Sequence, residues 1–157
     1  MPRWCGGVFL AALALGCSHG AERMLLDQFF SQSRLLDRTA LQSFATVQFQ
    51  PHLDGTITTF TIVSVSPEET RPLADVVSET RVAELSVEDP RQPVTIPAGG
   101  GEMVSKEVTI EAPVRLPDGR TVGKTLNIIL QRAMLKGDRE IAGRWIVTGV
   151  AARETER

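Results

Sequence analysis

The chain has 157 residues, of which 42% are hydrophobic, and its formal net charge is −2, so we expect one domain with one core. This near-neutral charge gives no electrostatic reason to expect a nucleic-acid partner. The absence of Tyr, together with only two His and two Cys, removes a common catalytic acid and leaves little material for a metal site, so we expect no cofactor and no metal.

The N-terminal segment predicts a signal for export that ends at a cysteine. An apolar run without charges covers residues 6–15. It is too short to span a bilayer, which needs about 20 apolar residues, but its length is typical of a secretory signal. The run ends in LALGC, where small Gly16 directly precedes Cys17. This segment resembles the lipobox of bacterial lipoproteins.

The lipobox resemblance implies cleavage between Gly16 and Cys17 and attachment of lipid to Cys17. Residues 1–16 are then a signal peptide and residues 17–20 a lipidated tether. Ser18 stands where Asp would signal retention in the inner membrane, so we expect an outer-membrane protein that faces the periplasm. An ordinary signal cleaved after Ala21, or an uncleaved anchor, is the alternative.

The first predicted element of the mature chain is an amphipathic helix over residues 21–37. Its apolar side chains gather on one side, and they are Leu25, Leu26, Phe29, Phe30 and Leu36. The polar side mixes Asp with Arg, which favours a helix that packs on a core over one that lies on a membrane. Thr39 and Gln42 then form a capping-box pattern, which predicts a second, short helix.

Strand patterns come next along the chain. Val47 and Phe49 alternate with polar residues and predict a strand over 46–50, followed by a turn over 51–55. The β-branched run 56–66 predicts another strand, with a bulge near Thr58 and Thr59 where the alternation slips by one residue.

Residues 67–105 are predicted to form a long loop or insertion. Five prolines fall in this stretch, and three consecutive glycines, 99–101, lie near its end. The glycines lack the context of a phosphate-binding loop. Ala83, Leu85 and Val87 alternate, so a short edge strand within the loop is expected.

The clearest pattern is a hairpin over residues 106–134. Pro117, Asp118 and Gly119 suit a three-residue hairpin loop, with Gly119 in the left-handed position. This loop sets Val114 opposite Val122. It also pairs Ala112 with Lys124, Ile110 with Leu126 and Val108 with Ile128. Turn chemistry and apolar pattern thus predict the same register.

The last predicted strand covers residues 144–150, with Trp145 at its start, and residues 151–157 form a charged tail. Residues 21–150 are therefore expected to be one α+β domain. The helix LLDQFFSQSRLLDRTALQSF and the closing strand GRWIVTGV resemble the nuclear-transport-factor-2-like, or cystatin-like, superfamily. The resemblance implies an N-terminal amphipathic helix packed on a curved antiparallel sheet, and it implies no particular function.

The hairpin register also predicts a polar face, on which Glu111 pairs with Thr125 and Thr109 with Asn127. A helix over this face would make Glu111 a buried carboxylate able to hold a polar ligand or act as a base. An open face would be an ordinary solvated surface. His52 lies in a predicted turn, and no constellation of catalytic side chains can be assembled.

These patterns favour a non-catalytic envelope lipoprotein that is anchored to the bilayer and binds a protein partner or a ligand. One alternative is a small roll-family enzyme, an isomerase or hydrolase that uses a buried carboxylate. The other is an accessory subunit of an envelope assembly.

Overall fold

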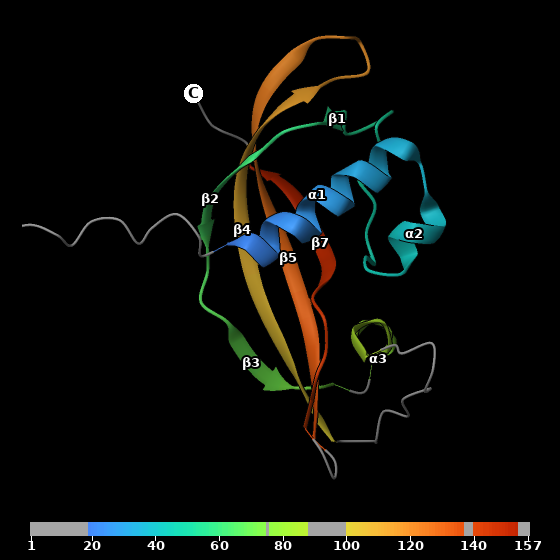
Figure 1. Ribbon diagram of the computed structural model, residues 1–157, viewed down its shortest axis with the longest axis vertical. Coiled ribbons are helices and arrows are strands. Elements are labelled where there is room, and N and C mark those ends of the chain that lie inside the picture. Colours follow the sequence, from blue (N-terminus) through green and yellow to red (C-terminus); the bar gives the residue numbers. More distant parts are fainter. Residues whose placement is uncertain (1–18, 75, 88–99, 137–139, 154–157) are drawn as a thin grey trace, which may run out of the picture.

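The computed structural model describes residues 19–74, 76–87, 100–136 and 140–153 (Figure 1). The predicted signal, Cys17 and residues 154–157 of the predicted tail lie outside these residues. The fold is α+β, with an N-terminal helix and an open antiparallel sheet of seven strands. The predicted fold class is confirmed at this level. In the described part of the chain, no helix is long and apolar enough to cross a membrane.

Two long strands form the centre of the sheet. They are β4 (Gly101–Arg115) and β5 (Thr121–Lys136), which pair along their whole length. Three short strands pair in succession along the outer edge of β4: β1 (Thr56–Ile57), β2 (Thr61–Val65) and β3 (Glu69–Pro72). Two more pair with the outer edge of β5: β6 (Glu140–Ala142) and β7 (Ile146–Arg153).

The predicted hairpin register is confirmed at every predicted pair. Val114 lies opposite Val122, and the pairing continues without a slip to Gly101 opposite Leu135. Gly119 adopts a φ of 89°, and its N–H donates to Leu116 O at 2.9 Å. The predicted bulge after β1 is also present. Ile57 and Thr61 are four positions apart, whereas their partners on β4, Val114 and Glu111, are three positions apart, so the outer strand contains one extra residue.

Helix α1 (Gly20–Leu35) lies across one face of the sheet (Figure 1), and its contacts show that this face carries the predicted apolar pairs. Its buried side chains Leu26, Phe29 and Phe30 belong to the same core cluster as Val108, Ile110, Leu126 and Ile128. Phe30 also makes edge-on or tilted contacts with the rings of Phe49 and Phe60. The helix ends at Leu35, two residues before its predicted end. Leu36 follows it in a left-handed conformation and is exposed, so the prediction that it belongs to the apolar side is wrong.

Helix α2 (Arg38–Gln42) is present, but the predicted capping box is wrong. The side chain of Asp37 accepts a hydrogen bond from Ala40 N at 3.0 Å, so Asp37 caps the helix two residues before the position that Thr39 suggested. The predicted strand over 46–50 is also wrong. Only Ala45 bridges the sheet, in a parallel contact with Val147, and the chain beyond it leaves the sheet edge.

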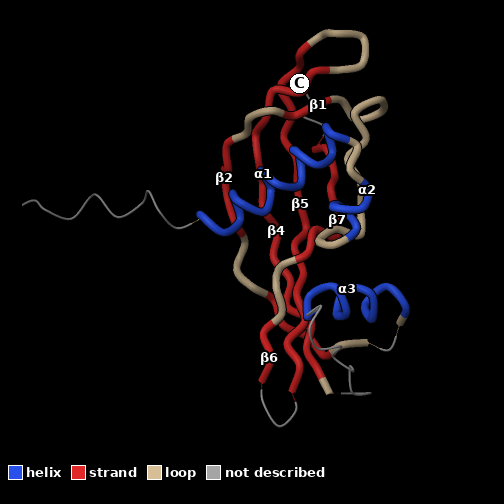
Figure 2. Tube along the Cα trace, turned by 45° about the vertical axis from the view of Figure 1, so that its right-hand side comes forward, coloured by secondary structure: helices blue, strands red, loops and turns tan. Residues whose placement is uncertain are grey.

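The predicted loop over 67–105 is wrong in its described parts, because it contains β3, helix α3 (Val77–Val87) and the start of β4. Residues 88–99 lie outside the described residues. Ala83 and Val87 pack with Ala133 and Leu135 in a second cluster. Since side chains alternate along β5, this cluster lies on the sheet face opposite α1. Figure 2 shows α3 beside one end of the long strands.

The C-terminal strand is longer than predicted. β7 continues to Arg153, which lies opposite Thr125, so residues 151–153 of the predicted tail belong to the sheet. β6 was not predicted, and the turn before it lies outside the described residues. The described fold therefore places α1 over one face, α3 against part of the other, and leaves an open area between α3 and the hairpin turn.

Candidate functional site

The structure brings the four residues of the predicted ligand face together. Thr109 lies opposite Asn127, with 3.4 Å between the Thr hydroxyl and Asn Oδ1, and Glu111 lies opposite Thr125. Glu111 is exposed and the other three are half-buried. The face is therefore a solvated sheet surface, and the buried carboxylate that the enzyme alternative requires is not provided by Glu111.

A hollow of about 380 Å³ lies at one end of this face. Its lining includes one acid, Glu111, and one base, Lys124, together with Thr61 and Thr125. His52 is exposed in the turn before β1 and does not line the hollow. This hollow thus offers a ligand charged and hydroxyl contacts on an exposed surface.

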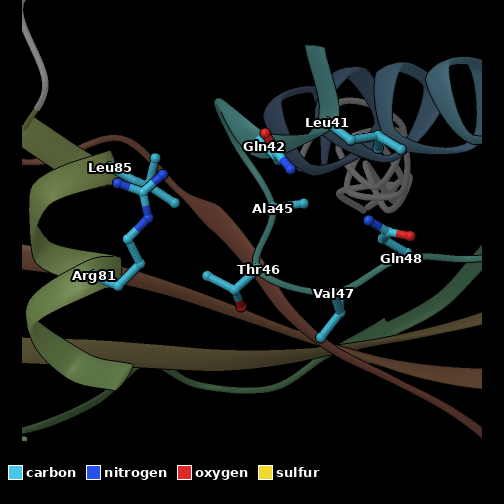
Figure 3. A pocket seen from close by; sticks show the side chains of 8 residues that line it. All are labelled: Leu41, Gln42, Ala45, Thr46, Val47, Gln48, Arg81 and Leu85. Carbon is cyan, nitrogen blue, oxygen red and sulfur yellow. The ribbon is translucent and has the colours of Figure 1, made fainter. Parts of the chain in front are cut away.

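A second hollow, of about 410 Å³, lies between helices α2 and α3 (Figure 3). Its floor is apolar, formed by the buried side chains of Leu41, Ala45 and Leu85. Gln42, the last residue of α2, and Gln48, in the chain after it, border the hollow on one side, and Arg81 borders it from α3 (Figure 3). We refer to this space as the α2–α3 hollow. Sequence analysis missed it because α3 was not predicted.

Arg144 holds the two helices that frame the α2–α3 hollow. Its guanidinium donates to Leu85 O at 3.0 Å, near the end of α3, and to Ser43 O, just after α2. Carbonyl groups at helix ends carry partial negative charge, so a cation is favourable there. The main-chain N–H of Arg144 donates to Ser86 O at 2.9 Å. Arg144, which lies two residues before β7, thus sets the spacing of α2 and α3.

The segment after α2 is held by the edge of β7. Thr46 N donates to Val147 O at 2.9 Å, and Val147 N donates to Phe44 O at 3.0 Å. These two bonds fix Ala45 against the core, while Thr46 and Gln48 remain exposed. The short parallel contact therefore positions Thr46 and Gln48, which form part of the polar lining of the α2–α3 hollow.

A third hollow, of about 380 Å³, shares Thr46 and Arg81 with the α2–α3 hollow. It extends over the sheet to Ile129, Gln131 and Thr148. Together the two hollows form a groove beside α3, which we call the Arg81 groove. Its polar lining consists of amides, hydroxyls and charged side chains: Gln42, Thr46, Gln48, Arg71, Ser78, Glu79, Arg81, Gln131 and Thr148.

The charged side chains of the Arg81 groove form ion pairs of unequal strength. Arg71 Nη2 lies 2.6 Å from Glu79 Oε1, and Glu79 also accepts from Ala74 N at 2.7 Å. The hydrogen bond from Arg71 outweighs burial and lowers the pKa of Glu79. Arg81 contacts Glu84 at 3.6 Å, and both side chains are more than half exposed. Such a pair is weak, so the Arg81 guanidinium can turn to an anionic ligand.

A separate charged cluster lies on the α1 side of the sheet. Lys106 Nζ is 2.6 Å from Glu22 Oε1 and 4.0 Å from the centre of the Trp145 ring. Arg132 lies over the same ring at 4.5 Å and contacts Glu68 at 3.3 Å. Each cation thus has an acid and an aromatic partner, as expected for a structural ion network.

Burial opposes ionisation of Glu22, but the hydrogen bond and charge of Lys106, together with a main-chain hydrogen bond, lower the pKa of Glu22. The sequence contained a signal for this cluster, since Lys106 falls on the apolar side of the predicted hairpin register, where a charge needs a partner. In the described residues, no group of three or more His, Cys, Asp or Glu side chains could hold a metal ion.

Comparisons of the chain with protein-family models, with curated proteins and with solved structures find no match.

Proposed function

We propose that this chain is a lipid-anchored protein of the bacterial cell envelope, whose α+β domain binds a partner without catalysing a reaction. The observation that carries the proposal is the position of Cys17. It follows an apolar run and a small residue, and the first helix begins at Gly20, three residues later. The acceptor cysteine therefore stands at the junction of a signal-like segment and the folded domain, as lipidation requires. Ser18, which stands where Asp would signal retention in the inner membrane, favours an anchor in the outer membrane.

We propose further that the fold is a cystatin-like roll. The support is the way α1 lies across one face of an antiparallel sheet, with most of the sheet following it in the chain (Figure 1). Helix α3, between β3 and β4, is an addition that the resemblance did not imply. The roll is a scaffold, and its function depends on the site that it carries.

The binding site of this proposal is the Arg81 groove, and its ligand is a polypeptide segment that carries a carboxylate. Amide and hydroxyl side chains suit the main chain of a peptide, and the apolar floor suits an aliphatic side chain. A guanidinium forms two parallel hydrogen bonds with a carboxylate. This ligand class matches an envelope protein partner with an exposed acidic residue or C-terminus.

The lipid anchor is tested by expressing the chain in a bacterium supplied with labelled palmitate. We expect the wild type and the neighbouring control Ser18→Ala to carry the label and to be processed. Cys17→Ala should lose the label and retain the signal segment. Label that persists in Cys17→Ala would overturn the lipoprotein proposal.

Partner binding is tested by crosslinking the lipidated protein in its own membrane and identifying the captured proteins by mass spectrometry. We expect one captured species to be lost in Arg81→Gln and kept in Arg115→Gln, which removes an exposed arginine outside the Arg81 groove. Equal capture by both variants would exclude the Arg81 groove as the site.

A further inference from the structure

We propose that the first turn of α1 and strand β2 lie against the lipid bilayer, so that the Arg81 groove faces away from it. This inference rests on the proposed lipidation of Cys17. It goes further, because it assigns a membrane-facing surface to the folded domain and thereby a direction from which a partner reaches the groove.

The short connection between Cys17 and α1 limits the distance of the domain from the membrane. Gly20 is three positions after Cys17, and an extended chain spans at most about 3.6 Å per residue. The Cα of Gly20 is therefore within about 11 Å of the Cα that carries the lipid. A Cβ placed on Gly20 would meet no atom within 4 Å, so no residue of the described part of the chain covers this position of the helix.

The start of α1 is fastened to the sheet, so the anchor holds the domain in one orientation. Glu22 and Lys106 form a 2.6 Å ion pair with side chains 11% and 6% exposed. Arg23 donates to Phe60 O at 3.3 Å and lies over the Phe60 ring at 5.1 Å. These contacts engage the first turn on two sides, and Leu26 is buried in the core one turn later.

Two exposed apolar side chains lie at this end of the domain. Met24 is 75% exposed and stands one helical turn after Gly20, on the same side of α1. Val63 is 54% exposed at a bulge of β2, between the pairs of Ile62 and Ser64 with β4. Both views place the start of α1 beside β2 (Figures 1 and 2). These side chains suit the boundary between headgroups and acyl chains.

The opposite side of the domain carries the Arg81 groove. Figures 1 and 2 both show α2 and α3 on the side of the sheet away from the start of α1. Since the tether holds β2 near the membrane, the groove opens toward the aqueous space, where a protein partner can enter it.

The cations at the membrane-facing end are already engaged by protein groups, namely Arg23 by Phe60 and Lys106 by Glu22. Anionic lipids therefore have no exposed basic cluster to attract among these residues. We expect the orientation to depend on the tether and on apolar contact, and to be the same in high salt and in vesicles without anionic lipid.

The experiment uses the lipidated protein in phosphatidylcholine vesicles that contain a lipid with a nitroxide headgroup. The sequence has only Cys5 and Cys17, so the processed protein offers no other thiol. Single cysteines are introduced as Val63→Cys and, as a matched control, Val77→Cys on α3, where the valine is 88% exposed. Each is labelled with an environment-sensitive fluorophore, and quenching by the nitroxide is measured.

We expect the probe at position 63 to be quenched several-fold more than the probe at position 77, although the second site is more exposed. Met24→Cys should behave like Val63→Cys. A long Gly-Ser insertion after Ser18 should remove the difference, because the domain then rotates freely on its anchor.

The outcomes separate this inference from the proposed function. Protein that carries lipid and sediments with the vesicles, but shows equal or reversed quenching at the two sites, would overturn the orientation alone. Protein without lipid that stays in solution would overturn both proposals.

Discussion

Lys106 and Glu22 are 84 positions apart in the chain, yet Lys106 Nζ and Glu22 Oε1 lie 2.6 Å apart. The pair joins the first turn of α1 to the middle of β4. Lys106 also lies over the Trp145 ring, which directly precedes β7. One buried cation thus connects the start of the folded chain, its central strand and the entry to its last strand.

Removing one partner of this pair should destabilise the domain. We expect Glu22→Leu to lower the free energy of unfolding by about 3 kcal/mol, because it leaves the buried Lys106 without its closest acid. The double variant Glu22→Leu/Lys106→Met should recover most of that loss, since no unpaired charge remains. Urea unfolding of the protein from Ser18 onward measures the free energy of unfolding of the single and the double variant. Glu84→Gln, which removes an exposed pair with Arg81, should change stability by less than about 1 kcal/mol.

The same pair predicts the response to acid. The pKa of Glu22 in the folded protein is lowered from its ordinary value of 4.5, so its stabilising effect is complete above that value. The effect is lost as the pH falls through the lowered pKa. We expect stability measured against pH to fall less steeply below pH 4.5 in Glu22→Gln than in the wild type. A slope remains in the variant because the pKa of Glu79 is lowered as well. Parallel curves of stability against pH for the two proteins would contradict the lowered pKa of Glu22.

The hairpin loop predicts a contrast between two glycines. Gly119 has a φ of 89° and open space around it, so Gly119→Val introduces backbone strain without a clash. We expect a loss of about 1–3 kcal/mol. Gly123 also has open space and lies within β5. Gly123→Val should leave stability unchanged or raise it, because valine favours strands. Equal melting temperatures for the two variants would show that the loop conformation is wrong.

Close packing of α3 depends on Gly143. A Cβ at this position would lie 2.6 Å from Ser86 Cβ and 2.8 Å from Ala133 O. We expect Gly143→Ala to push α3 from the sheet and to cost about 1–3 kcal/mol. Gly20→Ala, at a helical position with open space, should be neutral or stabilising. Thermal unfolding of both variants measures the difference.

The frame of the Arg81 groove depends on Arg144. We expect Arg144→Gln to lower stability by about 2 kcal/mol, because the groups at the ends of α2 and α3 lose a charged donor. Relative to the wild type, hydrogen exchange in this variant should accelerate more in α3 than in β4. Arg153→Gln, an exposed change at the far end of β7, is the control. Unchanged protection of α3 in Arg144→Gln would show that the helix is held by its apolar contacts alone.

Local patterns predicted the hairpin and α1 correctly. The loop residues 117–119 and the alternation on either side of them lie within one continuous segment, so the turn and the strands specify one register. The apolar side of α1 likewise repeats every three or four residues within a single helix. No distant partner is needed to recognise either element.

The cap of α2 was a local error, because Asp37 and Ala40 are three residues apart. The other errors involve contacts between distant segments. Val47 and Phe49 alternate as in a strand, but the edge of β7 accepts only the residue before them, Ala45. Ala83, Leu85 and Val87 alternate too, yet Val82 and Ser86 are also buried, which is the pattern of a helix with one side against the sheet. The apolar residues alone could not distinguish these cases, because the choice depends on which surface covers them.

Four features could be predicted from local sequence alone: the turn at Gly119, the register of the central hairpin, the amphipathic side of α1 and the position of Cys17 after its apolar run. Each of these follows from neighbouring residues and from the period of helix or strand. Three other features exist only in the folded chain: α3 covers part of the second sheet face, Arg144 spaces α2 from α3, and Lys106 pairs with Glu22. Those features depend on burial, and a polar or charged group is buried stably only where folding brings a partner to it from a distant part of the chain.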